Sequence, residues 1–495
     1  MNAPLDKDLQ SIQQARTLAE RCRAAQREFA SASREQVHRV CEAVSQACYD
    51  EAKRLADMAH AETGYGNPEH KLMKNQFASR RVWEYIREIE TVGVIERDEV
   101  RKMMTMAEPV GVVAALTPST NPTSTAIFKS LIALKGRNGI VVSPHPSAAR
   151  STVETVAIIA RAAEAAGAPK GLVSCLDLAT YAGTQELLKH YAVNVILATG
   201  GGPMVRAAHS TGKPAYGVGP GNVPAWVDRS ADLPKVARDL VNSGSFDCSL
   251  LCSTEQAIFA DRQIANELRR LMESEGAYWV PQEHHAELGR LLFHPDGAIN
   301  ASSVGQSAQA LASTAGFPIP AGTRVLVVPL AGVGRDHVFS REKLTSVMGF
   351  MAVEGAEEGL RCCIEMLRFG GDGHSAVLHS ADAKQVEYMA ARLPAYRIVV
   401  NSMSTLGAVG FTCGFAPSFT LGTGGIGGAV SSDNITVSHL INRKRVAWEL
   451  NSWGTSQSGT TENAVAPSTT NIDDIVARVL ARLSAQPKTG ATQST

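Results

Sequence analysis

One short stretch of the chain combines residue types that could carry out nucleophilic chemistry. Residues 245–256, SFDCSLLCSTEQ, follow a helix-like run at 233–242 and precede an apolar run at 257–260 that predicts a strand. Cys252 in this turn is the candidate nucleophile, because a thiolate is strongly nucleophilic and backbone N–H groups near a helix end lower a thiol pKa. The alternative is a small buried hydrophobe, the usual state of a free cysteine.

The stretch resembles the nucleophile segment of the aldehyde dehydrogenase superfamily, in its coenzyme A-acylating branch. That pattern is Phe-Asp, a few small or apolar residues, then the Cys and a Ser/Ala-Ser/Thr-Glu-Gln tail. Phe246, Asp247, Cys252 and Thr254-Glu255-Gln256 match it, and the resemblance runs from roughly residue 16 to residue 453. It implies that an aldehyde is oxidised through a thioester on Cys252, and that nearby Cys248 is not the nucleophile.

The loop TPSTNPT at 117–123 resembles the branch's Pro-x-x-Asn-Pro-Thr loop. The resemblance implies that the Asn121 amide donates to the oxyanion formed on the aldehyde, with the Cys252 backbone N–H as a second donor. Alignment with hydrolytic relatives, whose loop is Pro-Trp-Asn-Phe-Pro, puts Thr120 at the asparagine position instead. Thr120 and Asn121 are therefore both candidates, and an Asn-Pro pair also starts turns that carry no chemistry.

The segment expected to release the thioester lacks a base. Hydrolytic relatives carry Glu-Leu-Gly-Gly-Lys, whose glutamate activates water, whereas Val218 stands at that position in GVGPGNVP. Since valine cannot be a general base, the thioester should await the thiol of coenzyme A. Gly373-His374-Ser375 resembles the branch's Gly-His segment, so His374 either helps to admit coenzyme A or is structural.

A glycine-rich turn follows the strand expected at 194–198. It contains Thr199, Gly200, Gly201 and Gly202, and a helix is expected next. Glycines let a backbone approach a phosphate, but ligand-free turns look the same, and the GxGxxG fingerprint is absent. The placement resembles the superfamily's Gly-Ser/Gly turn, which implies that these residues contact the nicotinamide end of the cofactor.

Other cofactor contacts are implied by the same resemblance. Ser143-Pro144-His145-Pro146 resembles the branch's Ser-Pro-His-Pro segment, which implies that His145 lies near the adenosine ribose. Ala148 replaces an acidic residue that would repel a 2′-phosphate, and Arg150 is close by, so the expected cofactor is NADP or NAD. Glu342 is expected at the nicotinamide ribose; its alternative is a surface carboxylate.

The order of the predicted elements indicates an α/β fold. Helices are expected from residue 9 to about 89, with a capping box at Ser33-Arg34-Glu35-Gln36, and a pair of strands at 92–108. Next come strands at 110–116, 139–143, 171–176 and 193–198, with helices at 123–135 and 149–166 between them. This alternation predicts a doubly wound parallel sheet that binds a nucleotide at the carboxyl ends of its strands. Later strands are expected at 325–330, ending at Pro329, and at 397–401.

The expected fold class is α/β and aldehyde dehydrogenase-like, with a doubly wound Rossmann-type cofactor domain, an α/β catalytic domain and a small oligomerisation arm. The expected segments are helices and the dinucleotide-binding domain at 1–231, the catalytic domain at 232–428, a return segment and arm at 429–453, a Ser/Thr-rich linker at 454–470, and an amphipathic helix at 471–485.

Composition limits the partners. The 495 residues contain 48 Lys and Arg against 48 Asp and Glu, which gives no support for a nucleic-acid or anionic-membrane partner. No run reaches the length of a membrane span, and no basic-then-apolar leader begins the chain. Nine scattered cysteines indicate reduced thiols in a cytoplasm, and no Cys/His spacing predicts a metal site.

Two partner predictions concern the C-terminal part. The resemblance implies a homodimer or tetramer joined by a strand arm, for which residues 437–448 are the candidate. Residues 471–485 carry an apolar stripe at helical spacing, which needs a surface to cover it. This tail resembles encapsulation peptides that load aldehyde dehydrogenases into bacterial microcompartments; the alternative is docking on its own subunit.

The leading functional interpretation is oxidation of a short-chain aldehyde with NAD(P)+ and acyl transfer to coenzyme A. Sulfoacetaldehyde is the specific substrate suggested, because the whole chain is similar to acylating sulfoacetaldehyde dehydrogenases. The alternatives are an enzyme like gamma-glutamyl phosphate reductase, which shares the fold and the Cys, and a non-catalytic scaffold. An intact Cys252 argues against the scaffold.

Overall fold

The computed structural model describes residues 6–451. The chain divides into a first unit, Met1–Val446, and a second unit, Ala447–Thr495, of which only residues 447–451 are described. The predicted linker at 454–470 and tail helix at 471–485 therefore lie outside the described residues. Nearly all of the described residues belong to the first unit.

Helices begin the described chain, as predicted from residue 9 onward. They are α1 (Lys7–Phe29), α2 (Arg34–Asp50), α3 (Ala52–Thr63), α4 (Pro68–Gln76), the π-helical η1 (Phe77–Arg81) and α5 (Val82–Ile86). The Ser33 side chain caps α2 by accepting from the Gln36 N–H at 3.2 Å. The Gln36 amide donates to the Gly167 carbonyl at 2.9 Å.

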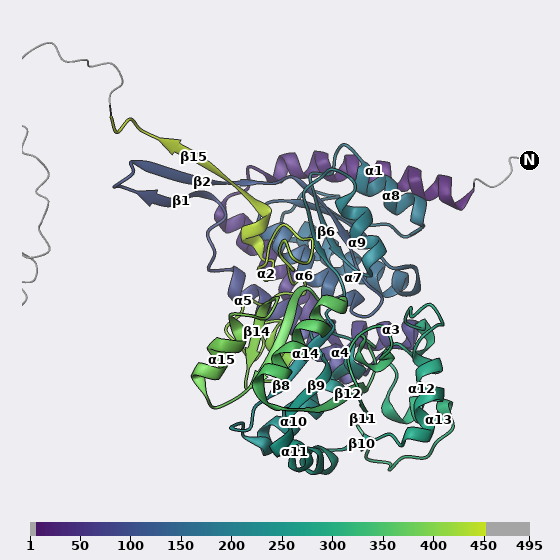
Figure 1. The fold of residues 1–495 in the computed structure, drawn as a ribbon. Helices are drawn as coiled ribbons and strands as arrows, with labels where there is room; N and C mark the ends of the chain where they lie inside the picture. The colour runs from purple at the N-terminus through teal and green to yellow at the C-terminus, as the bar shows by residue number, and fades with distance from the viewer. Residues whose placement is uncertain (1–5, 452–495) are drawn as a thin grey trace, which may run out of the picture. The chain divides into compact units, whose positions relative to one another are not determined.

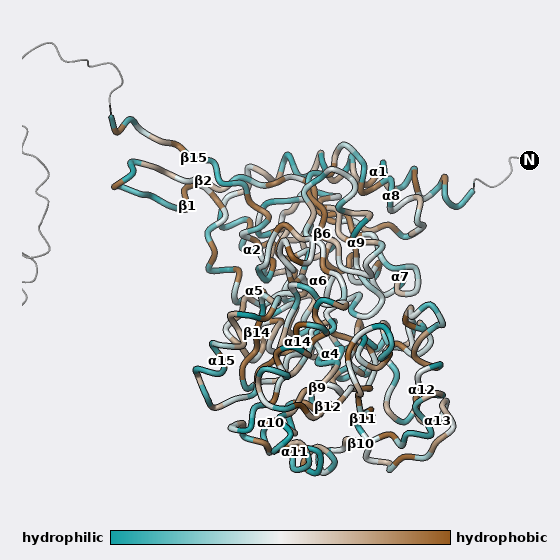
Figure 2. Tube along the Cα trace, in the orientation of Figure 1, coloured by the Kyte–Doolittle hydropathy of each residue, from teal (hydrophilic) through white to brown (hydrophobic). Residues whose placement is uncertain are grey.

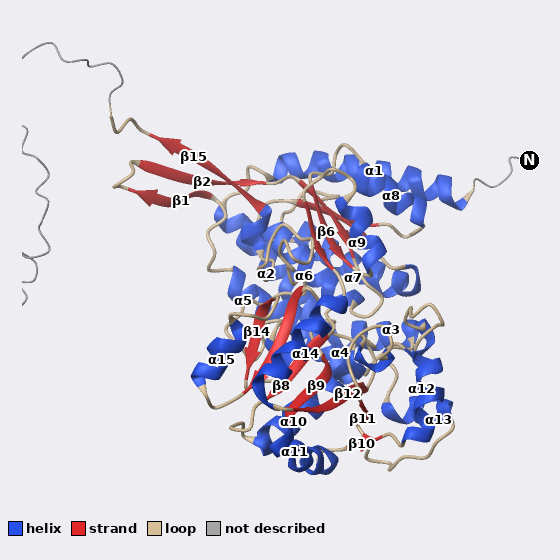
Figure 3. Cartoon of the chain, in the orientation of Figure 1, coloured by secondary structure: helices blue, strands red, loops and turns tan. Residues whose placement is uncertain are grey.

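The first sheet has five parallel strands in the order β5-β4-β3-β6-β7. Figure 3 shows its strands, near the label β6, among the surrounding helices. The strands and the helices between them are β3 (Val112–Leu116), α6 (Pro122–Lys135), β4 (Gly139–Ser143), α7 (Ala149–Ala165), β5 (Val173–Cys175), α8 (Tyr181–Lys189), β6 (Val195–Thr199), α9 (Gly202–His209) and β7 (Ala215–Val218). The doubly wound sheet predicted from sequence is confirmed. Predicted strand ends differ from these by up to two residues.

Alternate residues of β3 explain why helices cover both faces of this sheet. Val112 and Ala114 pack in one apolar cluster with residues of α1 and α8, whereas Val113 and Ala115 pack in another with residues of α2, α6 and α7. Successive side chains of a strand point to opposite faces, so a wholly apolar strand needs cover on both. Figure 2 shows hydrophobic residues gathered along the sheet strands.

The second sheet has seven parallel strands in the order β10-β11-β12-β9-β8-β13-β14. The elements of this region are β8 (Val223–Val227), α10 (Leu233–Ser245), η3 (Phe246–Ser249), β9 (Glu255–Asp261), α11 (Arg262–Ser274), β10 (Ala277–Trp279), α12 (His285–Leu292), α13 (Ala308–Ala315), β11 (Val325–Pro329), β12 (Val347–Val353), α14 (Gly355–Gly370), β13 (Gly373–His379), α15 (Ala383–Ala390), β14 (Ala395–Val400) and α16 (Ser404–Gly407). The chain thus changes sheets between β7 and β8. The domain division at residue 231 stays a prediction.

A third sheet of three strands has the order β1-β2-β15. It joins β1 (Gly93–Asp98) and β2 (Met103–Pro109), which pair antiparallel, to β15 (Ile441–Ala447) near the end of the described chain. Figure 1 shows these strands projecting beyond the helices of the unit. A chain segment about 340 residues downstream of β2 therefore completes the small sheet, where the arm was expected.

Candidate active site

Two adjoining cavities lie at the carboxyl ends of the first sheet's strands. One of about 440 Å³ is lined by residues that follow β3, β4 and β6. The other, of about 330 Å³, contains Cys252 and residues of the loop after β3. They share five lining residues: Pro118, His145, Thr199, Gly200 and Gly201. The carboxyl edge of a parallel sheet is where such folds bind nucleotides, so the structure supports the site predicted there.

Cys252 stands in the turn between α10 and β9, as predicted. The backbone ahead of it is strained: Asp247, Cys248 and Ser249 have φ of 47°, 53° and 60°. Such left-handed conformations are uncommon outside glycine, and three in succession persist only where the surroundings hold them. This turn presents Cys252, but not Cys248, to the second cavity.

The Cys252 thiol contacts one histidine directly. His374, at the start of β13, places Nε2 at 3.2 Å from Cys252 Sγ, and its Nδ1 lies 3.0 Å from Ser375 Oγ. When Nδ1 carries the ring proton and donates to Ser375, Nε2 is free to accept from the thiol. The sequence left His374 as either functional or structural; the contact places it at the nucleophile.

Burial sets the charge of this pair. It raises the pKa of Cys252 to about 12, with a further increase from the Glu342 carboxyl. The Arg397 guanidinium and the backbone N–H groups of Cys252 and Ser253 act in the opposite direction but are smaller effects. Burial and the nearby Arg397 lower the pKa of His374 to about 3. The pair is therefore a neutral thiol beside a neutral imidazole, rather than the thiolate that the backbone N–H argument predicted.

Both candidate oxyanion donors line the cavity that contains Cys252. Asn121 precedes α6, yet its side chain makes no capping hydrogen bond to that helix, which argues against a turn-starting role alone. Its Nδ2 donates to Thr120 Oγ1 at 3.1 Å and to the Leu250 carbonyl at 3.4 Å, while its Oδ1 accepts from Lys74. The Asn121 donor atom thus faces the turn that leads to Cys252.

The larger cavity has the properties of a cofactor site. The hydroxyls of Thr117 and Thr199 are buried on its wall and have no hydrogen-bond partner. Buried polar atoms without partners call for an explanation, and a polar ligand in the cavity would supply one. A nicotinamide nucleotide would find hydrogen-bond partners in these two hydroxyls.

The predicted cofactor residues are not all at the cavities. His145, Thr199, Gly200 and Gly201 line both cavities, and Gly202 begins α9 immediately after them. Arg150 lies apart from the lining: its guanidinium is largely exposed and 3.6 Å from the carboxylate of Glu62.

Glu342 is part of the site rather than a surface carboxylate. It lines the second cavity and accepts from the Gly221 N–H at 2.8 Å. Burial raises its pKa to about 7. Gly221 also lies against Cys252, because a Cβ on it would come within 1.7 Å of the Cys252 carbonyl oxygen. Val218 lines the same cavity and offers only an apolar side chain there.

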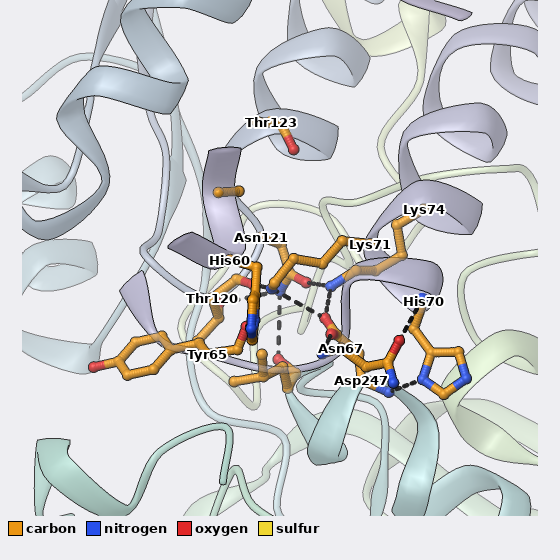
Figure 4. A network of polar contacts seen from close by, with 12 residues as sticks. His60, Tyr65, Asn67, His70, Lys71, Lys74, Thr120, Asn121, Thr123 and Asp247 are labelled. Carbon is orange, nitrogen blue, oxygen red and sulfur yellow. Dashed lines mark hydrogen bonds and ion pairs between the residues drawn. The ribbon is translucent and has the colours of Figure 1, made fainter. Parts of the chain in front are cut away.

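Sequence reasoning missed two buried lysines beside the site. Lys71 and Lys74 on α4 are 2% and 3% exposed, and both contact the Asp247 carboxylate (Figure 4). Lysine is rarely buried. The available signal was their spacing of three residues, which places both on one helix face.

Searches for other classes of site found none in the described part. Among residues 6–451, no three His, Cys, Asp or Glu side chains are grouped so as to hold a metal ion. None of the helices described there has the length and apolar character that a bilayer crossing requires.

Comparison with known proteins gives consistent matches. A model of the aldehyde dehydrogenase family matches residues 8–284. An aldehyde-alcohol dehydrogenase of Streptococcus pneumoniae is 42% identical over 82% of this chain and 47% of its own length. A sulfoacetaldehyde dehydrogenase of Acholeplasma sp. is 35% identical over 86% of this chain and 89% of its own. The chain thus spans about half the length of the aldehyde-alcohol dehydrogenases it matches.

Solved structures share the fold. An acetylating aldehyde dehydrogenase from Geobacillus thermoglucosidasius has a TM-score of 0.90 and 44% identity, covering 91% of this chain and all of its own. A propionaldehyde dehydrogenase from Rhodopseudomonas palustris, with bound CoA and an acylated cysteine, has a TM-score of 0.81 and 29% identity over 88% of this chain and 97% of its own.

Two further solved structures are informative about ligands and context. An engineered glycolyl-CoA reductase with bound NADP+ has a TM-score of 0.80 and 28% identity, over 88% of this chain and 96% of its own. A propionaldehyde dehydrogenase from a fucose-utilisation microcompartment of Clostridium phytofermentans has a TM-score of 0.79 and 27% identity, over 87% of this chain and 96% of its own.

Proposed function

Because the chain belongs to the aldehyde dehydrogenase family, we propose that it oxidises a short-chain aldehyde with NAD(P)+ and transfers the acyl group to coenzyme A. One observation carries the proposal: the Cys252 thiol lies 3.2 Å from a neutral histidine, in a cavity continuous with a nucleotide-sized one. The acylating names of the relatives, together with the CoA-bound neighbour, favour this activity over the glutamyl phosphate reductase and scaffold alternatives.

Thioester formation uses residues already in contact. His374 Nε2 takes the proton of the Cys252 thiol, and the sulfur adds to the aldehyde carbon. The Asn121 side-chain amide and the Cys252 backbone N–H donate to the oxyanion that forms. When bound, the nicotinamide supplies the acceptor for the hydride that leaves this carbon as the thioester forms. The imidazolium then releases its proton to solvent.

Acyl transfer reuses the same histidine. His374 takes the proton of the coenzyme A thiol, whose sulfur attacks the thioester carbonyl, and the Cys252 thiolate leaves. That thiolate recovers the proton from His374. The overall reaction converts aldehyde, coenzyme A and NAD(P)+ into acyl-CoA, NAD(P)H and one proton. Val218, at the place of the hydrolytic glutamate, gives water no base, so the thioester persists until coenzyme A arrives.

The cofactor contacts are assigned to residues of the two cavities. His145 serves the adenosine ribose, Thr199 to Gly202 the end near the nicotinamide, and Glu342 the nicotinamide ribose. NAD and NADP are both compatible with Ala148 and its neighbour Arg150. Arg150 would have to leave Glu62 to meet a 2′-phosphate. Dissociation constants for the two oxidised cofactors, measured on wild type and Arg150→Ala, test that contact.

Sulfoacetaldehyde is the proposed substrate among short aldehydes. The support is the 35% identity to a sulfoacetaldehyde dehydrogenase over most of both chains. A panel of acetaldehyde, propionaldehyde, succinate semialdehyde and sulfoacetaldehyde should be ranked by kcat/KM with coenzyme A and each cofactor. If these aldehydes yield NAD(P)H but none of them yields acyl-CoA, that result would contradict acyl transfer itself.

The assembly is proposed to be a homodimer or tetramer in the cytoplasm. The support is the projecting sheet of β1, β2 and β15, whose backbone edges suit pairing with another copy. Sedimentation at micromolar concentration should show at least a dimer, and a monomer would contradict this role of the arm.

The tail at 471–485 is proposed to bind a microcompartment shell. The support is the apolar stripe in its sequence and the microcompartment origin of one structural neighbour. Truncation after Gly459 should leave turnover unchanged and abolish co-purification with shell proteins. A truncated enzyme that loses activity would instead assign the tail to the enzyme's own fold.

A further inference from the structure

A buried group of charges lies beside the nucleophile turn and has no part in the proposed reaction steps. It consists of Lys71, Lys74 and Asp247, whose side chains are at most 3% exposed. Two ammonium groups share one carboxylate, so the fully ionised group has a net charge of +1. Burying an excess charge costs free energy, so the contacts of these charges should explain why the group is there.

Asp247 holds the strained turn in place (Figure 4). Its Oδ2 accepts from Lys74 and, at 3.3 Å, from Lys71, while its Oδ1 accepts from the Asn67 N–H at 2.7 Å. Its own N–H donates to His70 Nδ1 at 2.8 Å. These contacts come from α4 and its N-cap residue Asn67, and they fix the first of the three left-handed residues that precede Cys252.

Lys74 reaches from that carboxylate to the candidate oxyanion donor. Its Nζ donates to Asn121 Oδ1, whereas Lys71 Nζ donates to the backbone carbonyl of Thr120 at 3.3 Å. Only Lys74 therefore contacts the Asn121 side chain itself. The two lysines carry the same charge on the same carboxylate, and differ in this contact.

The Lys74 contact decides which way the Asn121 amide faces. A side-chain amide has an acceptor oxygen and a donor nitrogen on opposite sides, and can rotate by half a turn. An ammonium can only donate, so it requires Oδ1 on its own side. Nδ2 then has to lie on the other side, where it donates to Thr120 Oγ1 and the Leu250 carbonyl. The opposite rotamer would present an acceptor to the oxyanion and repel it.

We propose that Lys74 is a positioning residue for thioester formation, because its ammonium fixes the Asn121 amide with the donor atom toward the Cys252 turn. This inference rests on the proposed function. Through Asp247 the same ammonium is tied to the backbone that presents the nucleophile. One side chain thus sets the donor and the nucleophile relative to each other.

The test compares Lys74→Met with Lys71→Met. Each removes one charge from the same buried carboxylate and replaces it with an apolar chain of similar length, but only the first releases the Asn121 amide. Single-turnover formation of NAD(P)H, measured with saturating aldehyde and cofactor, reports thioester formation. It should fall at least about tenfold further in Lys74→Met, up to the 10²–10³-fold that loss of an oxyanion donor costs. Cofactor affinity should be equal in both variants.

A double-mutant cycle with Asn121→Ala distinguishes a positioning role of Lys74 from a merely structural one. If Lys74 acts through Asn121, the double variant Lys74→Met/Asn121→Ala should be no slower than Asn121→Ala alone. Lys74→Arg, which keeps a donor-only cation, should recover part of the rate. Equal losses in Lys74→Met and Lys71→Met, or independent losses in the double variant, would overturn the proposal.

A second variant tests the proposal if Lys74→Met does not fold. Should Lys74→Met not fold, Lys74→Gln keeps a polar group that can donate or accept and so no longer imposes one amide rotamer. It should lower kcat with little change in the aldehyde KM, and an unchanged kcat in the folded Gln variant would overturn the proposal. A wild type that forms no NAD(P)H from any aldehyde would remove the proposed function itself, and the inference with it.

Discussion

Replacing His374 by alanine should slow thioester formation far more than replacing His379. Both histidines lie on β13, are fully buried, and have a pKa lowered to about 3 by burial. Only His374 contacts the nucleophile, at 3.2 Å. His379→Ala is therefore a matched control for the loss of a buried imidazole from this strand.

The size of the effect follows from the pKa of the thiol. With a pKa of about 12, only about one Cys252 in 10⁴ would be a free thiolate at pH 8. His374 offers a route without a free thiolate, because it can take the proton while the sulfur–carbon bond forms. A positioned base contributes about 10²–10⁴-fold, so the loss in His374→Ala should lie within that range.

The pH profile separates the two ways of losing the proton. Transfer from Cys252 to His374 does not change the net charge of the pair, so the wild-type rate should be nearly flat between about pH 8 and 9, above the titration of the neighbouring Glu342 near pH 7. In His374→Ala the thiolate forms only by loss of a proton to solvent. Its rate should therefore rise about tenfold per pH unit over this range, since the assay pH is far below the thiol pKa.

The assay is a stopped-flow measurement of the NAD(P)H burst with saturating aldehyde, on wild type, His374→Ala and His379→Ala. Cofactor affinity, measured separately, should be the same in all three. A His374→Ala burst within a few-fold of the His379→Ala burst, or a flat pH profile in His374→Ala, would refute internal proton transfer.

Three other outcomes are expected. Cys252→Ala should abolish turnover and keep cofactor binding, whereas Cys248→Ala should keep turnover, because Cys248 lies outside the cavity that contains Cys252. The reverse result in steady-state assays would reassign the nucleophile. Without coenzyme A the wild type should form free acid slowly, and Val218→Glu should raise that rate by supplying the missing base. Rapid formation of free acid by the wild type, measured by chromatography, would contradict this. Burial raises the pKa of Glu255 from 4.5 to about 7. The folded protein therefore loses stability as the pH rises from 5 through 7, and Glu255→Gln should avoid on the order of 3 kcal/mol of the loss between pH 5 and 8.5. An equal change in the free energy of unfolding of both proteins over this range, measured by denaturant melts, would argue against it.

Prediction from sequence was most successful where local patterns decide the structure. The apolar strands at 112–116 and 139–143, covered by helices on both faces, were readable because wholly apolar runs between helices have few other places in a soluble fold. The motif also predicted the turn between a helix and a strand in which Cys252 stands. The cavity lining by His145 and Thr199 was also expected, since both follow strands whose carboxyl ends meet at one edge.

The missed features depend on contacts between distant segments. Cys252 and His374 are 122 residues apart, and their 3.2 Å contact follows from how β9 and β13 flank β8 in one sheet. The burial of Lys71 and Lys74 follows from the packing of α4 against the nucleophile turn, which no local sequence pattern reveals. The thiol pKa depends on distant segments in the same way: the backbone N–H groups lower the Cys252 pKa as expected, but burial raises it by more.

That burial also connects the two halves of the proposed reaction. Burial disfavours separated charge, which leaves Cys252 and His374 neutral at rest, so the thiol should give its proton to His374 only as the sulfur bonds to the carbonyl carbon. Val218 at the cavity wall supplies no base to a water molecule at the position of the hydrolytic glutamate once the thioester has formed. A thiol differs from water here because it is far more acidic and can pass its proton to the same imidazole. Acyl transfer to coenzyme A, rather than hydrolysis, thus follows from the environment that forces the nucleophile to share its proton with His374.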